Sequence, residues 1–345
     1  RSIGRLAAEQ DALFVGVGGD VFETNQVDPR TVGRTLEALA EVPVPVFLLP
    51  GNHDPLDAGS VFRSPTFLRD MPEHVTVLED SEPHAVAPGV EVVGAPWTSK
   101  RPLYDLVGGV CGELEVEPGV RRILLAHGAT DDLMAFDNPA LISVSGAEAA
   151  IEDGRIAFVG LGDRHSTTEV GSTGRIWYPG APEPTDYDEQ DPGNALVVEL
   201  AADGSTSVTP HHVGTWEFVY HSCTLDGPGT IDELETWLGE RTDKDRTTVK
   251  LALEGAISLT EDARLRELLE RNRQLFAAIE EHERRTDLVV RPDDDDFEDL
   301  ALSGFAQEAL DTLRAAADDD DEGAEVARDA LGLLVRFAGV GEERA

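Results

Sequence analysis

The sequence predicts an α/β fold for the first two thirds of the chain and a smaller α+β domain for the remainder. Short runs rich in Val, Ile and Leu, bounded by Gly, Pro, Asn or Asp, recur through the first part and indicate strands. A helical segment lies between the first two runs, and such a strand–helix–strand unit implies parallel pairing. From about Trp216, helix-start patterns become frequent, so we place two domains at residues 1–214 and 215–345.

The elements of the first domain follow from these patterns in order. Residues 2–10 and 29–41 are expected to be helices, the second because Leu36, Leu39 and Ala40 fall at helical spacing. Strands are expected at residues 12–17, 44–49, 75–78, 90–93, 122–126, 156–161, 175–178, 195–200 and 207–213. Because the chain opens on a helix that leads directly into a parallel strand, we expect an earlier strand upstream of Arg1.

The second domain has two clear helix starts. Thr230-Ile231-Asp232-Glu233 and Ser258-Leu259-Thr260-Glu261 both fit the capping-box pattern, and the second helix is expected to run to about residue 285. Strands are expected at residues 247–253 and 288–290, and further helices at 304–317 and 324–337. The aspartate runs at 293–296 and 318–321 are expected to be solvated loops.

Composition excludes several classes of protein. No run approaches the roughly 18 apolar residues of a membrane helix, and residues 1–10 lack the features of a signal peptide, so a cytoplasmic location is the default. The two cysteines, Cys111 and Cys223, are far apart and have no Cys-x-x-Cys spacing, which argues against a disulfide framework or a thiolate zinc site. Any metal must therefore be held by nitrogen and oxygen atoms.

The net charge of -40 is extreme, and only three lysines are present. Such a surface repels a polyanion. We interpret it as a solvated acidic surface suited to a salt-rich setting, in which charges are screened over a few Å. An acidic surface that docks a basic partner is the alternative.

Two of the predicted strands end in groups that can carry chemistry. Val17-Gly18-Gly19-Asp20 leaves a carboxylate at the carboxyl end of a strand, where open sheets build their sites. Leu49-Pro50-Gly51-Asn52-His53-Asp54 places an amide, an imidazole and a carboxylate directly after another strand. An Asp after two glycines has an ordinary explanation as a turn residue, but no turn requirement explains Asn, His and Asp in that order.

Two further strand ends carry similar groups. His127 ends an apolar strand in a His-Gly pair, and Asp163 and His165 follow another strand, two residues apart and thus on one side of an extended segment. A single histidine at a strand end is usually a hydrogen-bonded structural residue. The four strand ends together supply a mixture of Asp, Asn and His that suits manganese, iron or zinc.

The order Gly-Asp, Gly-Asn-His-Asp, His-Gly and Gly-x-x-His resembles the calcineurin-like metallophosphoesterase superfamily, and it is most similar to the SbcD and YhaO-like DNA-repair exonuclease branch. The segment Tyr178-Pro-Gly-Ala-Pro-Glu-Pro184 and a C-terminal domain that looks like the family's capping domain support this branch. The resemblance implies a four-layer α/β/β/α sandwich, in which two divalent ions hydrolyse phosphodiester bonds. Manganese is the expected metal, with iron, zinc or magnesium as alternatives.

The resemblance also implies roles for individual residues. Asp20 would bridge the two metal ions, and His165 would be a ligand of the first ion. The second metal would be bound by Asn52, His127 and Asp163. His53 would be the acid, oriented by Asp54, and Arg164 could hold a phosphate oxygen or be a plain surface arginine.

Two departures from the family pattern matter. Asp163 stands where the family usually has histidine, which leaves metal affinity and metal choice open. The opening Asp-x-His of the pattern is absent, and we expect it on the strand upstream of Arg1.

The resemblance further implies DNA as substrate, an SbcC-like coiled-coil ATPase as partner, and leaves a homodimer open. Two other functions stay open: a phosphoesterase for small nucleotides, and a catalytically weak scaffold that organises DNA ends for the ATPase. The absent first motif and Asp163 favour the scaffold.

Overall fold

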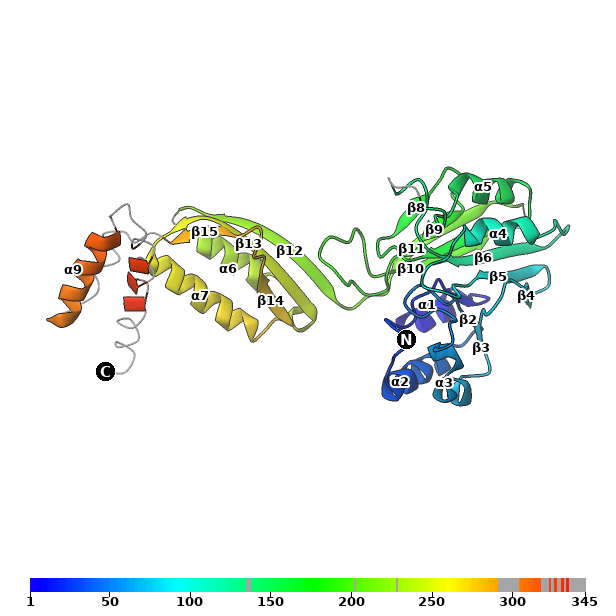
Figure 1. Ribbon diagram of the computed structural model, residues 1–345, viewed down its shortest axis with the longest axis horizontal. Helices are drawn as coiled ribbons and strands as arrows, with labels where there is room; N and C mark the ends of the chain where they lie inside the picture. Colours follow the sequence, from blue (N-terminus) through cyan, green and yellow to red (C-terminus); the bar gives the residue numbers. More distant parts are fainter. Residues whose placement is uncertain are drawn as a thin grey trace. The chain divides into compact units, whose positions relative to one another are not determined.

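A computed structural model describes residues 1–134, 138–201, 203–227, 229–290 and 304–317, and the single positions 323, 326, 327, 330, 331, 333 and 334 (Figure 1). The chain divides into two compact units, Arg1–Thr215 and Trp216–Ala345. The aspartate runs predicted as loops lie outside the described residues, and the predicted helix at 324–337 lies within them only in part.

The first unit contains two sheets that face each other. A parallel three-stranded sheet has the order β1-β2-β3, and a mixed six-stranded sheet has the order β4-β5-β6-β7-β9-β8. Within the larger sheet the neighbours from β5 to β9 are parallel, whereas β4 and β8 pair antiparallel at its edges. A separate antiparallel pair, β10-β11, completes the strands of this unit. The strands are β1 (Val15–Val17), β2 (Val46–Leu48), β3 (Val75–Val77), β4 (His84–Ala87), β5 (Val90–Ala95), β6 (Arg121–His127), β7 (Phe158–Gly162), β8 (Thr168–Val170), β9 (Ile176–Tyr178), β10 (Asn194–Leu200) and β11 (Thr206–His212).

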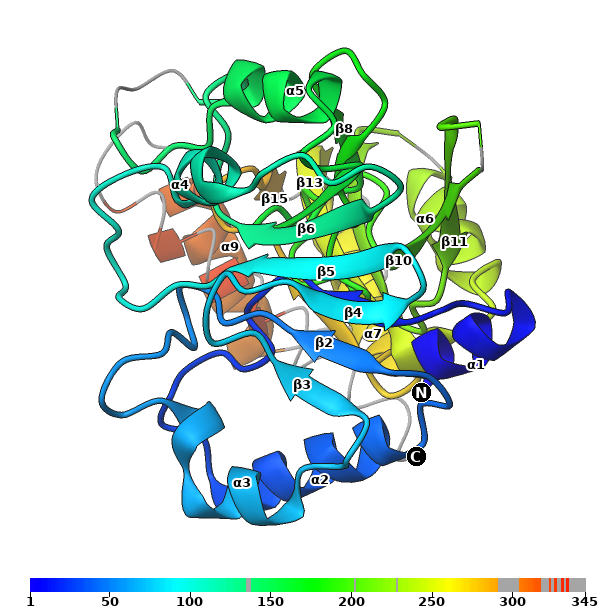
Figure 2. The ribbon, with the colours of Figure 1, turned by 90° about the vertical axis from the view of Figure 1, so that its right-hand side faces the viewer.

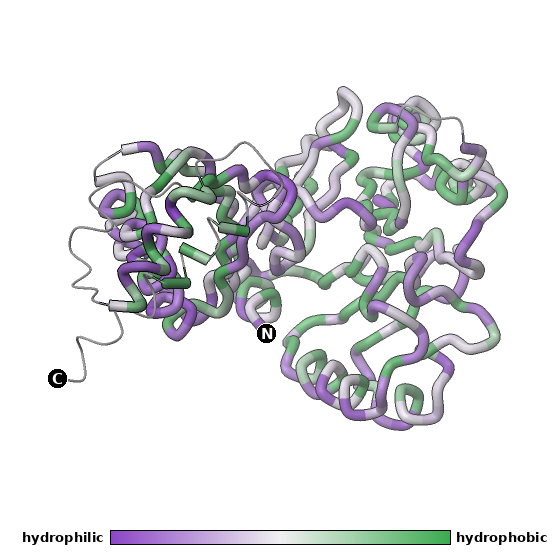
Figure 3. The backbone as a smooth tube through the Cα atoms, turned by 60° about the vertical axis from the view of Figure 1, so that its left-hand side comes forward, coloured by the Kyte–Doolittle hydropathy of each residue, from purple (hydrophilic) through white to green (hydrophobic). Residues whose placement is uncertain are grey.

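Helices cover the outer faces of the two sheets. Figure 2 shows α2 and α3 beyond β2 and β3 at one end, and α4 and α5 beyond β6 at the other. The helices of this unit are α1 (Ser2–Glu9), α2 (Pro29–Ala40), η1 (Val61–Arg63), α3 (Pro65–Asp70), α4 (Leu106–Glu113) and α5 (Val144–Glu152). Hydrophilic and hydrophobic residues alternate along α2, at the bottom of Figure 3, as expected for a helix with one face against a sheet.

Three hydrophobic clusters fill the spaces between the four layers. Val46 and Leu48 of β2 join a cluster with residues of α2 and α3, whereas Phe47 points to the opposite face and packs between the sheets with Ile123 and Leu125. This alternation follows from the two-residue period of a strand. A third cluster joins the other face of the six-stranded sheet to α4 and α5. The predicted four-layer α/β/β/α fold is therefore confirmed.

The second unit is built on parallel strands. β13 (Thr247–Ile257) pairs with β12 (Glu217–Leu225) on one side and with β14 (Ala278–Glu281) and β15 (Asp287–Val290) on the other. Residues of α6 (Thr230–Gly239) and α7 (Leu259–Arg273) share one hydrophobic cluster with Val249, Leu251 and Leu253 of β13. A further helix, α9 (Phe305–Ala317), matches the helix predicted at 304–317.

Two local predictions in this unit are wrong. Ser258 forms the predicted capping box, but α6 begins after Gly229, and the Thr230 hydroxyl donates to the carbonyl oxygen of Gly227 instead. The helix predicted from Ser258, α7, ends at Arg273 and not near residue 285. Residues that follow it form β14, which pairs with β13 in the sheet. Among the described residues, no helix is long and apolar enough to span a membrane.

Candidate metal centre

The carboxyl ends of β1, β2, β6 and β7 carry the predicted site residues. Asp20 lies just beyond β1, Asn52 just beyond β2, and Asp163 directly after β7, while His127 is the last residue of β6. The first two strands belong to the three-stranded sheet and the other two to the six-stranded sheet. The site therefore lies where the carboxyl ends of strands from the two sheets come together. Parallel sheets commonly place their functional sites at the carboxyl ends of the strands.

Three side chains converge on the Nε2 atom of His127. Asp20 Oδ2 lies 3.3 Å from this atom, Asp163 Oδ1 lies 3.6 Å from it, and Asn52 Oδ1 lies 2.8 Å from it. The Asn52 amide is better satisfied when turned over, because its nitrogen then donates to His127 Nε2 at 2.8 Å and to the Asp20 oxygens at 2.9 and 3.2 Å. In the other orientation of the Asn52 amide, the oxygen faces this position and could bind a cation.

The other ring nitrogen of His127 is occupied. Nδ1 lies 2.8 Å from the carbonyl oxygen of Gly18, which can only accept, so Nδ1 donates and Nε2 faces the centre. The imidazole is fully buried, whereas Asp20 and Asp163 are 27% and 33% exposed. The centre is thus open to solvent on the side of the carboxylates.

The charges of the centre are strongly coupled. Burial alone would raise the pKa of Asp20, but the hydrogen bond and charge of His127 outweigh burial and hold this pKa below its ordinary value. Burial would lower the pKa of His127, yet Asp20 raises it above its ordinary value. Burial also raises the pKa of Asp163, and the nearby charge of Asp20 adds to this rise, although His127 opposes it. A cation at this position would relieve the repulsion between the two carboxylates.

Two glycines allow the strand-end loops to approach this closely. Gly19 has φ 103°, and a side chain there would run into the His127 ring. A side chain at Gly51 would meet the Asp20 carboxylate. Asp20 itself has φ 52°, a conformation that few residues other than Gly, Asn and Asp adopt, so the loop is built around the position of this carboxylate.

Trp97 supports the centre and was not predicted. Its indole Nε1 donates to the carbonyl oxygen of His127 at 2.7 Å, and its ring lies edge-to-face with the imidazole at 5.7 Å between centroids. Tyr178 similarly donates to the carbonyl oxygen of Gly128 at 2.7 Å. An aromatic residue after a strand is too common a pattern to reveal such a role from sequence.

The expectation that Asp54 orients His53 is wrong. Asp54 is fully buried and accepts from the backbone N–H groups of Gly51 at 2.7 Å and Phe22 at 2.9 Å, so it joins the loops after β1 and β2. The His53 ring instead places Nδ1 3.0 Å from the carbonyl oxygen of Glu23 and 3.2 Å from its carboxylate. Glu23 was missed, although it lies only three residues after Asp20 in the same loop.

The residues after β7 separate in the structure. Asp163 has φ 96°, so the segment is not extended and the predicted alternation does not apply. Asp163 turns to His127, whereas His165 Nδ1 contacts Thr185 and Glu189. Arg164 is exposed and its Nε donates to the Thr168 hydroxyl at 2.7 Å. Asp20, Asn52, His127 and Asp163 are thus brought together, whereas no hydrogen bond or ion pair joins Arg164 or His165 to them in the described part of the chain, although the charge of His165 acts on Asp163.

The spacing of the donor atoms fits a cation. Neighbouring ligands of an octahedral ion with bonds of about 2.1 Å lie about 3.0 Å apart, and those of a tetrahedral ion about 3.4 Å apart. The separations of 2.8, 3.3 and 3.6 Å from His127 Nε2 fall around these values. Among the described residues, no group of three His, Cys, Asp or Glu side chains is placed to hold an ion, so an ion at this position would need Asn52 or water molecules as further ligands.

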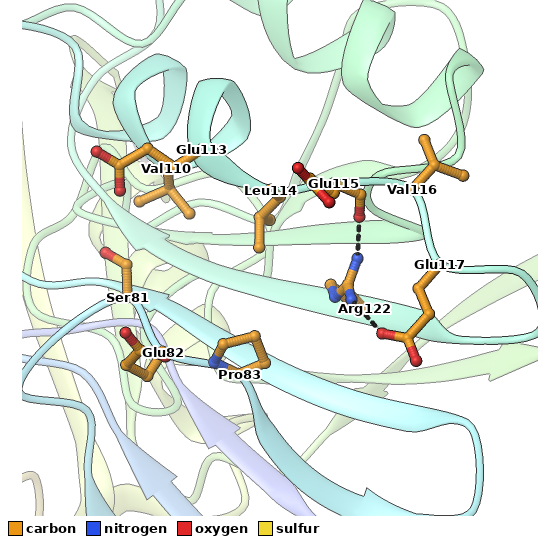
Figure 4. Close-up of a pocket in the computed structure, with 10 residues that line it drawn as sticks. All are labelled: Ser81, Glu82, Pro83, Val110, Glu113, Leu114, Glu115, Val116, Glu117 and Arg122. Atoms are coloured by element: carbon orange, nitrogen blue, oxygen red, sulfur yellow. Dashed lines mark hydrogen bonds and ion pairs between the residues drawn. The ribbon is translucent and has the colours of Figure 1, made fainter.

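A cavity of about 490 Å³ lies elsewhere in the first unit (Figure 4). Its lining includes Arg122, the second residue of β6, whereas His127 is the last, so the two sites are separated by about 17 Å along the strand. Glu82, Glu113 and Glu117 also line this cavity, and such a charge repels phosphate. This cavity is therefore not the catalytic site.

Sequence similarity to known proteins identifies a family for this chain. A sequence profile of the calcineurin-like phosphoesterase family matches residues 2–199. One solved crystal structure is similar at 15% identity over 61% of this chain and 92% of the other, with a TM-score of 0.37. A crystal structure of TT1561 from Thermus thermophilus is similar at 12% identity over 61% of this chain and 91% of the other, again with a TM-score of 0.37. No curated protein matches significantly. Since the profile spans more than half of the sequence, the chain belongs to the calcineurin-like phosphoesterase family, which implies metal-dependent hydrolysis of phosphoesters.

Proposed function

We propose that this protein hydrolyses phosphodiester bonds in DNA with the help of two divalent ions, and that manganese is the physiological metal. The observation that supports a metal centre is the convergence of Asp20, Asn52 and Asp163 on His127 Nε2. Oxygen and imidazole ligands without thiolate suit manganese, and iron, zinc and magnesium are the alternatives. When bound, the two ions would activate a water molecule and neutralise charge on the phosphate.

The site residues would have two roles, as metal ligands and as a proton donor. Asn52, His127 and Asp163 would hold one ion, His165 would hold the other, and Asp20 would touch both. His53 is half-exposed and its Nδ1 contacts Glu23, so a protonated ring would present Nε2 as the nitrogen that donates a proton to the leaving oxygen. The Glu23 carboxylate, which is 89% exposed, lies 3.2 Å from Nδ1 and is a further acceptor for this nitrogen.

DNA as substrate rests on two features of the chain. The order of the motifs resembles the SbcD-like exonuclease branch, and a second compact unit follows the metal centre, where that branch has its capping domain. On this proposal the protein acts in DNA repair as an exonuclease or endonuclease, with an SbcC-like coiled-coil ATPase as partner and either one or two copies in the assembly.

Nuclease assays on the full-length protein test this proposal. Linear DNA should be degraded with manganese, and Asn52→Ala and His53→Ala should each lower the rate by about 100-fold or more, as expected when a ligand or a general acid is lost. His74→Ala is the matched control, because its ring contacts the carbonyl oxygen of Leu39 outside the centre. Activity that survives both substitutions in the centre would exclude it as the catalytic site.

One observation favours a second candidate function. The net charge of -40 opposes binding of a polyanion, so small nucleotides or other small phosphoesters are the alternative substrates. Side-by-side kcat/KM values for linear DNA, a cyclic nucleotide and bis-p-nitrophenyl phosphate separate the two. A preference for the small esters by tenfold or more, about 1.4 kcal/mol, would reject DNA as the main substrate.

A catalytically weak DNA-end scaffold is the third candidate, because Asp163 replaces an expected imidazole. The metal content of the purified full-length protein distinguishes this case. Two tightly bound ions per chain support an enzyme, whereas fewer than two support a scaffold.

A further inference from the structure

A buried carboxylate lies against His165. The loop between β9 and β10 places Glu189 Oε1 2.9 Å and Thr185 Oγ1 2.7 Å from His165 Nδ1. The Glu189 side chain is only 8% exposed, whereas that of His165 is 54% exposed. Burying a carboxylate costs free energy unless hydrogen bonds compensate, so the partners of Glu189 reveal what it does.

The hydrogen bonds determine which nitrogen of His165 carries the proton. Thr185 donates twice to Glu189, from its backbone N–H at 3.0 Å and from its hydroxyl at 2.6 Å. With its hydroxyl proton committed, Thr185 can only accept from His165, and a carboxylate can also only accept. In the neutral ring, Nδ1 therefore carries the hydrogen and Nε2 carries the lone pair.

The loop is attached firmly to the His165 segment. The backbone N–H of Ala181 donates to the carbonyl oxygen of His165 at 2.9 Å, and that of Gln190 donates to the Ser166 hydroxyl at 2.9 Å. Glu189 thus lies between two fixed points, and its carboxylate position is set by the loop and not by the exposed ring that it contacts.

The other two histidines of the site show the same arrangement. His127 gives Nδ1 to the carbonyl oxygen of Gly18, and His53 gives Nδ1 to that of Glu23. Metal-binding histidines usually give their second N–H to a protein oxygen in this way, which sets the ring orientation and the tautomer. At His165 the oxygen comes from a side chain outside all of the sequence motifs.

We infer that Glu189, assisted by Thr185, is a positioning residue that holds His165 with Nε2 ready to bind a divalent cation. This inference rests on the proposed function, since it concerns a ligand of the proposed second ion. It predicts that the loop at 181–190 contributes to metal affinity although it supplies no ligand itself. The competing explanation is that Glu189 only stabilises its own loop through Thr185.

Ring tautomers and metal affinities separate these explanations. Glu189→Gln keeps the shape of the side chain, and Glu189→Ala removes it. Glu148→Gln is the matched control, because the Glu148 carboxylate likewise accepts from the N–H and hydroxyl of one loop residue, Ser172, at 2.6 and 2.9 Å. The ring nitrogens of His165 are observed by long-range ¹H–¹⁵N spectra of the metal-free full-length protein, with His165→Gln to assign them.

The wild-type spectrum should show His165 with the hydrogen on Nδ1, and Glu189→Ala should shift the ring toward a mixture of tautomers. In manganese titrations of the full-length protein, both Glu189 variants should weaken one of two sites by about 10- to 100-fold and leave the other within about twofold. Glu148→Gln should change neither. If Glu189→Ala fails to fold, the manganese titration of Glu189→Gln alone distinguishes the positioning role of Glu189 from a role in stabilising its own loop.

Unchanged ring signals and unchanged affinities for both sites in the Glu189 variants would overturn the inference while leaving the proposed function intact. A wild-type protein that binds no divalent ion would overturn the proposed function and this inference together. The two failures are therefore distinguishable.

Discussion

The Nδ1 atom of His127 lies 2.8 Å from the carbonyl oxygen of Gly18 and links the two sheets of the first unit. Gly18 follows β1 of the smaller sheet, and His127 ends β6 of the larger one. This hydrogen bond joins the sheets at their carboxyl edges and turns Nε2 toward Asp20, Asn52 and Asp163. The fold and the candidate metal centre are therefore connected through one imidazole.

Gly51→Ala should weaken metal binding. A methyl group at this position would meet both the carboxylate and the backbone nitrogen of Asp20, so the Asp20 loop must shift and carry the carboxylate away from the His127 ring. We expect manganese affinity to fall by about 100-fold, the upper end of the effect of disturbing a ligand's surroundings. Gly59→Ala in the same loop is the control, because a methyl group there makes only an ordinary contact with Asp57. Equal affinities in the two variants, measured by calorimetry, would contradict the role of Gly51.

Asp54→Asn should destabilise the first unit. Both oxygens of the Asp54 carboxylate accept from backbone N–H groups, and the amide turns one of these acceptors into a donor. A buried N–H left without a partner costs about 1–3 kcal/mol, so the free energy of unfolding should fall by that amount. Asp57→Asn is the control, since Asp57 lies nearer the surface, where it accepts from Gly59 and Asn25. Denaturant unfolding curves that coincide for the two variants would argue against the role of Asp54.

Protons should compete with the metal for His127. Burial lowers the pKa of this imidazole, but Asp20 outweighs burial and raises the pKa above its ordinary value. Because the cation needs the unprotonated ring, affinity should be full above this raised pKa and fall as the pH drops through it, by up to about tenfold per pH unit. Manganese titrations between about pH 6 and pH 8 measure this dependence. An affinity that stays constant over that interval would contradict the assignment of His127 as a ligand.

Salt should help this protein bind DNA, in contrast with most nucleic-acid-binding proteins. At a net charge of -40, the dominant long-range force between protein and DNA is repulsive. Raising the salt concentration from about 0.1 M to about 1 M shortens the screening length from about 10 Å to about 3 Å, so KM for linear DNA should fall. Bis-p-nitrophenyl phosphate, a small ester with a single negative charge, provides the control, because its KM should change much less with salt. A KM for DNA that rises steeply with salt would show that attraction by basic residues controls binding, as in ordinary complexes.

Local signals were sufficient to predict an α/β domain and the four strand ends that carry the site residues, because apolar runs and the residues that follow them are read directly from the sequence. The four-layer sandwich was predicted from the resemblance to a known family and not from these patterns. The partner of His53 was not predictable, since Glu23 and Asp54 are both acidic residues in adjacent loops and only the backbone path decides between them. Trp97 and Glu189 were also missed, because each acts through a contact between segments more than 20 residues apart. The end of α7 was misplaced because the residues after Arg273 suit a helix or an edge strand equally, and the pairing with β13 decides the outcome.

The most direct test is a crystal structure of the full-length protein grown with manganese, with anomalous differences used to locate the ion. We expect an anomalous peak within about 2.0–2.3 Å of donor atoms from Asp20, Asn52, His127 and Asp163. An ion bound elsewhere at full manganese occupancy, with Asp20, Asn52 and Asp163 still in their metal-free contacts with His127, would contradict this expectation.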